Sequence, residues 1–186
     1  CKSATAVCVG DAKDIPAMPD KFKVIYGGTI TSYEFPTLQK MHEQANKSPE
    51  DYYCYIHSKG VSKPQSRAWL DSGWRQYMMW GVIEQWRECI DSLNAGHDIA
   101  GVEWYKNLIP CKTGGKPVDN CHGFFAGNFF WSTGKHLKTL PEINSLDSAN
   151  RWNAEAWIGL GDKPNVYEVL NVHTIERTGM FPRSFC

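Results

Sequence analysis

The sequence lacks a long apolar run and lacks an excess of charge of either sign. No stretch of about 18 consecutive apolar residues occurs, so we expect no transmembrane segment. Lysine plus arginine number 20 and aspartate plus glutamate number 20, which gives a formal net charge of zero. A balanced charge provides no long-range attraction to nucleic acid, so we expect no nucleic-acid partner.

Motifs that mark several common enzyme classes are also absent. The chain contains no GxGxxG, no GxxxxGK[ST], no GxSxG and no HExxH. These absences argue against dinucleotide-dependent dehydrogenases, P-loop NTPases, α/β-hydrolases and HExxH zinc proteases. No CxxC pair accompanies Cys121-His122, so we predict no metal-ligating residues from that dipeptide.

The cysteines form no regular framework. There are 7, an odd number without short regular spacing, and Cys8 and Cys54 sit inside apolar runs where reduced cysteine behaves as a small hydrophobe. This usage favours a reducing compartment, so we expect a cytoplasmic location. A disulfide between Cys111 and Cys121, which lie in one loop, stays open as an exception.

The pattern of apolar segments predicts a single α/β domain over residues 1–186. Apolar strand-like segments alternate with helix-like segments, which is typical of a mainly parallel central sheet flanked by helices on both faces. The run YYCYI is apolar throughout, as expected of a strand covered on both sides, so we expect 52–57 to be central. The predicted strands are 5–10, 22–26, 52–57, 99–104, 124–131 and 166–172, and the predicted helices are 35–46, 66–94, 133–140 and 149–160.

Ligands of such sheets bind beyond the carboxyl ends of the strands. His57 and Lys59 follow the third predicted strand directly, and Gly60 frees the backbone. Two cationic side chains there suit phosphate oxygens. The alternative is an ordinary turn with a solvated lysine.

Two further segments carry polar residues in telling positions. Gly127-Asn128 interrupts an aromatic run, which indicates either close approach of a ligand or a β-bulge. Asn128 can donate to and accept from sugar hydroxyls. Arg151 and Glu155 are spaced to share a helix face, either as a surface ion pair or as a general base held by a cation.

Several of these segments together resemble a known family. The sequence is similar to the GT-A fold glycosyltransferases of bacterial polysaccharide clusters and large algal (chlorella-type) viruses, and YIHSKG also resembles the His-x-Lys motif of rhamnan-synthesis proteins. The matching segments occur in the family's order and are YEFPTLQ (33–39), YIHSKGVS (55–62), WRQYM (74–78), IEQWRECIDSLNAGHDIAGVEW (83–104), FAGNFFW (125–131), and LP (140–141) followed by RWNAEAWIG (151–159).

The resemblance implies a hexosyl- or deoxyhexosyl-transferase with a nucleotide-diphospho-sugar transferase fold. It would move a sugar from a UDP- or dTDP-type donor to a surface-polysaccharide or glycoprotein glycan. The implied roles are a catalytic base for Glu155, donor binding for His57, Lys59, Gly60 and Gly27, and acceptor binding for Asn128, Trp131, Trp104 and Arg151.

The sequence departs from the family pattern in two places. Most GT-A enzymes carry an Asp-x-Asp metal motif, and this chain has none. Lys59 standing near that place would replace the cation as partner of the diphosphate, so we expect no cofactor. The alternative is Mn²⁺ or Mg²⁺ with His57 as a ligand. The family also usually carries about one more βα unit before residue 5, so a second expectation is that this first unit is missing.

Two other function classes compete with a transferase. One is a non-catalytic nucleotide-sugar or carbohydrate-binding domain of a larger protein. The other is a hydrolase that pairs Glu155 with Glu103 or Asp98.

Overall fold

The computed structural model describes residues 3–15, 17–58, 68–106 and 121–169. The protein is mixed α/β. Its strands are β1 (Ala4–Cys8), β2 (Phe22–Tyr26), β3 (Tyr52–Tyr55), β4 (Ile99–Gly101), β5 (Trp104–Tyr105), β6 (Phe124–Phe125), β7 (Phe130–Thr133) and β8 (Val166–Glu168). Its α-helices are α1 (Phe35–Lys47), α2 (Ala68–Met79), α3 (Trp86–Asn94), α4 (Gly134–Thr139) and α5 (Trp152–Ala156).

The largest sheet has four strands in the order β3-β7-β4-β8. β7 is antiparallel to both β3 and β4, and β8 is parallel to β4. Therefore β3, β4 and β8 point the same way and β7 opposes them. The register places Tyr55, Phe130, Gly101 and Glu168 in one row across the sheet. That row marks the carboxyl ends of three strands and the amino end of β7.

The expectation of one mainly parallel sheet with 52–57 at its centre is not met. β1 pairs with β2 in a separate parallel sheet, and β5 pairs with β6 in a small antiparallel one. Among the described strands, β3 lies at one end of the four-stranded order. Tyr52 at its start is 38% exposed. The apolar run predicted a strand, but an apolar run carries no information about direction or neighbours.

The segment 124–131, expected to be one interrupted strand, is instead two strands joined by a turn. Gly127 and Asn128 both have positive φ, 83° and 61°. The Asn128 backbone N–H donates to the carbonyl of Phe125 at 2.9 Å and closes the turn. This turn sends β7 back through the middle of the sheet, which is why the sheet is mixed.

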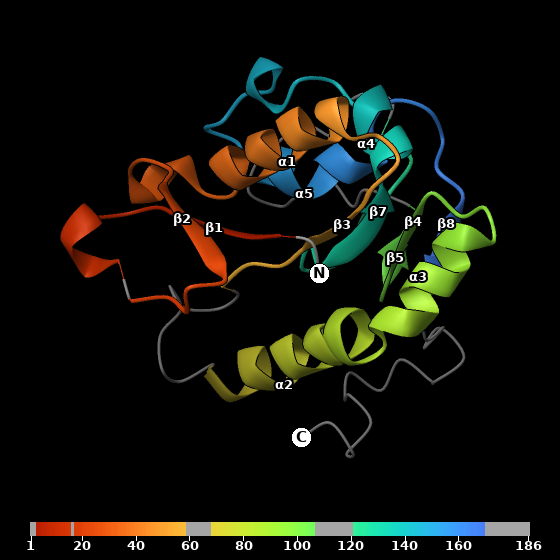
Figure 1. The fold of residues 1–186 in the computed structure, drawn as a ribbon, viewed down its shortest axis with the longest axis horizontal. Helices are drawn as coiled ribbons and strands as arrows, with labels where there is room; N and C mark the ends of the chain where they lie inside the picture. Colours follow the sequence, from red (N-terminus) through yellow and green to blue (C-terminus); the bar gives the residue numbers. More distant parts are fainter. Residues whose placement is uncertain (1–2, 16, 59–67, 107–120, 170–186) are drawn as a thin grey trace.

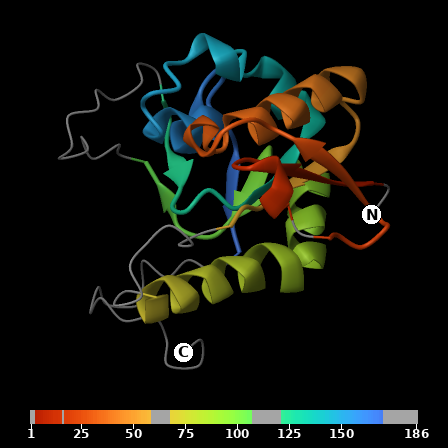
Figure 2. The same cartoon turned by 90° about the vertical axis from the view of Figure 1, so that its left-hand side faces the viewer.

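Helices cover both faces of the strands, as predicted (Figure 1). α1, α4 and α5 lie on one face and α2 and α3 on the other, and the side view of Figure 2 shows the same two layers. Successive residues of β4 serve the two cores: Ile99 packs in the α1 and α4 core, and Ala100 packs in the α2 and α3 core. Alternation of side chains along a strand explains this division.

The long predicted helix 66–94 is helical but bent. A π-helical turn, Trp80–Glu84, separates α2 from α3, and the Gln85 N–H reaches back to the carbonyl of Trp80 at 2.9 Å. A Cβ on Gly81 would lie 2.3 Å from Cγ1 of Val102. Glycine therefore allows the bent helix to approach β4 closely.

The other predicted elements are present with altered ends. The prediction for α1 is confirmed, with Pro36 in its first turn. Thr133 caps α4 by accepting from the His136 N–H at 3.1 Å. The predicted helix 149–160 is shorter, because α5 ends in a 3-10 turn, Trp157–Gly159. Of the predicted strand 166–172, the structure shows β8, and residues beyond 169 lie outside the described part.

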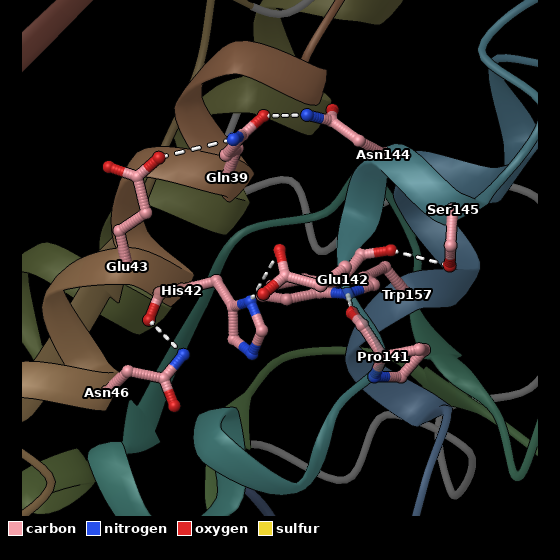
Figure 3. Close-up of polar contacts among 9 residues, drawn as sticks. All are labelled: Gln39, His42, Glu43, Asn46, Pro141, Glu142, Asn144, Ser145 and Trp157. Atoms are coloured by element: carbon pink, nitrogen blue, oxygen red, sulfur yellow. Dashed lines mark hydrogen bonds and ion pairs between the residues drawn. The ribbon is translucent and has the colours of Figure 1, made fainter.

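Polar contacts join α1 to the segment after α4 (Figure 3). The buried His42 ring lies edge-on to Trp157, with centroids 5.7 Å apart, and its Nδ1 lies 3.6 Å from Oε2 of Glu142. The Trp157 indole N–H donates to the carbonyl of Pro141 at 2.8 Å. Asn144 donates a further hydrogen bond to Gln39 on α1. These contacts hold α5 against α1, and thereby position Glu155.

Candidate functional site

A group of polar side chains gathers at the end of the sheet where β3 finishes and β7 begins. His57 follows β3, and Asn128 lies two residues before β7. Because Tyr55 and Phe130 are register partners, the residues that follow Tyr55 and those that precede Phe130 lie at the same end of the sheet. Glu34 reaches the same place from the position directly before α1. We call Glu34, Tyr55, His57 and Asn128 the Glu34 cluster.

Three side chains converge on the carboxylate of Glu34. Oε2 accepts from the Tyr55 hydroxyl at 3.1 Å and from Nδ2 of Asn128 at 2.5 Å. Oε1 lies 3.5 Å from Nδ1 of His57. The side chains of Glu34 and His57 are each 18% exposed, so the carboxylate is mostly screened from water but reachable from outside. Charge-assisted contacts of this kind fix geometry strongly.

The His57 ring is held by several neighbours at once. It stacks on Tyr55 with centroids 5.9 Å apart and meets Phe129 edge-on at 5.2 Å. Nε2 lies 2.9 Å from the carbonyl oxygen of Gly127, so Nε2 carries a proton and donates. A second proton, on Nδ1, would complete an ion pair with Glu34. His57 thus links β3 to the 126–129 turn.

Asn128 is fully buried at 0% exposure, in a left-handed backbone conformation with φ of 61°. Besides its bond to Glu34, Nδ2 donates to the carbonyl of Ala154 on α5 at 3.4 Å. Its Oδ1 has no hydrogen-bond partner in the part of the chain that the structure describes. A buried acceptor without a partner is costly, so the Oδ1 atom of Asn128 is available to accept a hydrogen bond.

Glu155 lies beside the Glu34 cluster. Burial raises the pKa of Tyr55 well above its ordinary value, and the negative charges of Glu34 and then Glu155 raise that pKa further. Glu155 is half-buried on α5, next to Ala154, whose carbonyl Asn128 contacts. The structure therefore brings together three of the predicted site residues, His57, Asn128 and Glu155. Their roles stay predictions.

The other predicted acceptor residues lie apart from this cluster. The Trp131 indole N–H donates to the carbonyl of Val82 in the π-helical turn at 2.6 Å, so its polar atom is already used. Trp104 is 4% exposed and packs edge-on against Phe125. Arg151 is exposed, with its guanidinium 4.8 Å above the ring of Trp152.

The predicted donor residues are only partly placed. Lys59 and Gly60 lie outside the described residues. Gly27 follows β2, and its N–H donates to the carbonyl of Cys8 at 2.7 Å. A Cβ at Gly27 would lie 2.7 Å from Cγ1 of Val7, so close packing between the strands already explains glycine there.

Sequence reasoning missed Glu34 and Tyr55 as site residues. Glu34 directly precedes Phe35-Pro36, the predicted helix start, where carboxylates are common because the helix dipole favours them. Tyr55 was assigned to the strand core. The available signal was that Glu34 lies inside YEFPTLQ and Tyr55 inside YIHSKGVS, two of the segments that carry the resemblance.

The carboxylates that a hydrolase would pair have different surroundings in the structure. Asp98 precedes β4, at the edge of the sheet opposite the Glu34 cluster, and its Oδ2 accepts from the Asn165 N–H at 2.8 Å. Burial, and then the charge of Glu103, raise the pKa of Tyr77, which packs in the α2 and α3 core. Glu155 lies by Tyr55, on the opposite face of the sheet from Tyr77, so Glu155 and Glu103 belong to different environments.

Within the described ranges, no group of three or more His, Cys, Asp or Glu side chains is placed to hold a metal ion. No helix in the same residues is both long and apolar enough to cross a bilayer.

Comparisons with models of protein families, with curated proteins and with solved structures find no match to this chain.

Proposed function

We propose that the chain is a glycosyltransferase that moves a hexosyl or deoxyhexosyl unit from a UDP- or dTDP-type donor to a glycan acceptor. The observation that carries the proposal is that four segments bearing the family resemblance meet at one end of the sheet. They meet through Glu34, His57, Asn128 and Glu155. An open α/β sheet usually holds its ligand at such an end.

The arrangement suits a direct displacement at the anomeric carbon. Glu155 takes the proton of the acceptor hydroxyl, the hydroxyl oxygen bonds to the anomeric carbon, and the bond from that carbon to the diphosphate oxygen breaks. His57, with Lys59 beyond it in sequence, supplies positive charge to the departing diphosphate. Asn128 and Glu34 orient His57 and the 126–129 turn. Holding the reacting groups in a fixed geometry of this kind lowers the barrier.

Two features of the fold support the finer assignment to the nucleotide-diphospho-sugar transferase type. Three of the four strands in the largest sheet point the same way, and helices lie on both faces. We further place the protein in the cytoplasm, where the free thiols of Cys8, Cys54, Cys89 and Cys121 would stay reduced. The acceptor would be a surface polysaccharide or a glycoprotein glycan.

One observation favours a second function, a non-catalytic domain that binds a nucleotide sugar or a glycan. Both oxygens of Glu34 already face protein partners, and His57 contacts Gly127 as well as Glu34. A carboxylate and an imidazole that are already held by protein partners can serve recognition without turnover.

Turnover of donor without acceptor distinguishes the two functions. We expect slow release of nucleoside diphosphate from one member of a panel of UDP- and dTDP-sugars, with water as acceptor. Glu155→Gln should lower that rate by about 100-fold or more, since a general base contributes roughly 10²–10⁴-fold. The same variant should keep the rise in Tm that UDP or dTDP causes.

Glu50→Gln is the matched control, because Glu50 is an exposed carboxylate that precedes β3, at the opposite end of that strand from His57. Its rate should equal that of the wild type. Binding of a nucleotide sugar without any turnover would favour the binding domain. If no nucleoside diphosphate changes Tm, with or without Mn²⁺, the transferase and the nucleotide-sugar-binding domain are both wrong.

A further inference from the structure

A pocket of about 380 Å³ lies beside β8, at the opposite end of the four-stranded order from β3. Val166 and Glu168, which alternate along β8 and so share a face, form one side. Lys163 and Pro164 precede that strand, and Trp104 belongs to β5. The pocket is therefore separate from the Glu34 cluster. Its size is within the range of roughly 300–1,000 Å³ that small-molecule sites occupy.

Basic side chains outnumber acidic ones around this pocket. Lys106, Lys163 and His122 line it together with a single carboxylate, Glu168. The chain as a whole has zero formal net charge, so this local excess does not follow from composition. Glu168 is oriented toward the backbone, because its Oε2 accepts from the Trp104 N–H at 3.2 Å. The two lysines are exposed and available to a ligand.

The remaining wall is apolar and well fixed. The Trp104 ring meets Phe125 edge-on at 4.9 Å, and a Cβ on Gly123 would lie 2.7 Å from that indole. Pro164 is buried, and Val166 packs against the core. A rigid aromatic and aliphatic wall suits the apolar C–H face of a sugar ring. Cationic groups beside such a wall suit an anionic substituent on that ring.

We propose that this pocket binds an anionic sugar, one that carries a carboxylate or a phosphate. The ring would lie by Trp104 and the anionic group by Lys106 and Lys163. The proposal rests on the proposed function only in making the ligand a saccharide, and under that function the pocket holds an acidic unit of the acceptor glycan. Trp104 then keeps its predicted part in acceptor binding, at a second position.

The test measures binding of four probes by calorimetry, with no nucleotide present. We expect glucuronate or glucose 6-phosphate to bind at least about ten-fold more tightly than glucose and than inorganic phosphate. Lys106→Gln and Lys163→Gln should each weaken that binding by about three- to five-fold, since exposed charges are partly screened by solvent. Binding should also weaken as salt rises from 0.05 to 0.5 M.

Lys138→Gln is the matched control, an exposed lysine on α4 that does not line the pocket, and should leave affinity unchanged. Glucose binding as tightly as both acidic sugars would overturn the proposal, as would equal effects of the three lysine variants. Inorganic phosphate binding as tightly as the acidic sugars would overturn the saccharide assignment, and so would no binding at all. Because no donor is needed, these outcomes are independent of whether the chain turns over nucleotide sugars.

Discussion

At the scale of single residues, Asn128 links several parts of the site. Its side chain links Glu34, before α1, to Ala154 on α5, and its backbone closes the turn that reverses the chain into β7. The left-handed conformation at Asn128 is one that asparagine tolerates and that most other residues pay about 1–2 kcal/mol to adopt. Side chain and backbone therefore both require this residue type.

Substitution of Asn128 separates these two contributions. Asn128→Ala should lower the free energy of unfolding by about 2–4 kcal/mol, because it removes a hydrogen bond to a charged group, worth about 1.5–3 kcal/mol, and adds backbone strain. Asn128→Gly removes the same bond but relieves the strain, so it should be about 1 kcal/mol less harmful. Urea unfolding measures both. Equal losses would show that the backbone of the turn contributes nothing.

At the scale of elements, the π-helical turn sets how α2 and α3 meet the sheet. The wider turn at Trp80–Glu84 places Gly81 against Val102. The carbonyl of Val82 accepts from the Trp131 indole at 2.6 Å. Such turns frequently lie near functional sites. Here the turn fixes the helix layer to β7, whose amino end carries Asn128.

Gly81→Ala tests this close approach. We expect a loss of about 1–3 kcal/mol in the free energy of unfolding, because the added methyl overlaps Val102. The double variant with Val102→Ala should lose less than the sum of the single losses, by more than about 0.5 kcal/mol, since the two sites share one contact. Gly73→Ala in α2 is the control: no atom lies within 4 Å of its added Cβ. It should raise stability by about 0.5–1 kcal/mol, and a loss equal to that at Gly81 would refute the packing argument.

At the scale of the whole molecule, local patterns predicted the elements better than their assembly. The pattern of apolar segments located α1 and α4, because these elements depend on neighbours in sequence. Strand order depends on the turn at Gly127-Asn128. The identity of these two residues alone does not determine the backbone conformation of the turn. The same holds for the site. His57, Asn128 and Glu155 were found from their positions after strands or from the resemblance, whereas Glu34 needed the fold to bring it to Tyr55.

The position of β3 makes a further prediction about the cooperativity of the entire fold. Cys54 on β3 is half-buried and Cys89 on α3 is buried, and poor solvation raises the pKa of each thiol to about 12. At pH 8 only roughly one thiol in 10⁴ would be ionised in the folded state, and only the thiolate reacts with alkylating agents. If both thiols keep these surroundings until the whole chain unfolds, both cysteines should react with iodoacetamide only after global unfolding. Their labelling rates, mapped by mass spectrometry in increasing urea, should then share the slope of the global unfolding transition. Labelling of Cys54 that is fast and insensitive to urea, while Cys89 stays protected, would instead show that β3 opens alone. The end of the sheet next to His57 would then be locally unstable. The geometry of the Glu34 cluster could not then be attributed to the cooperative fold.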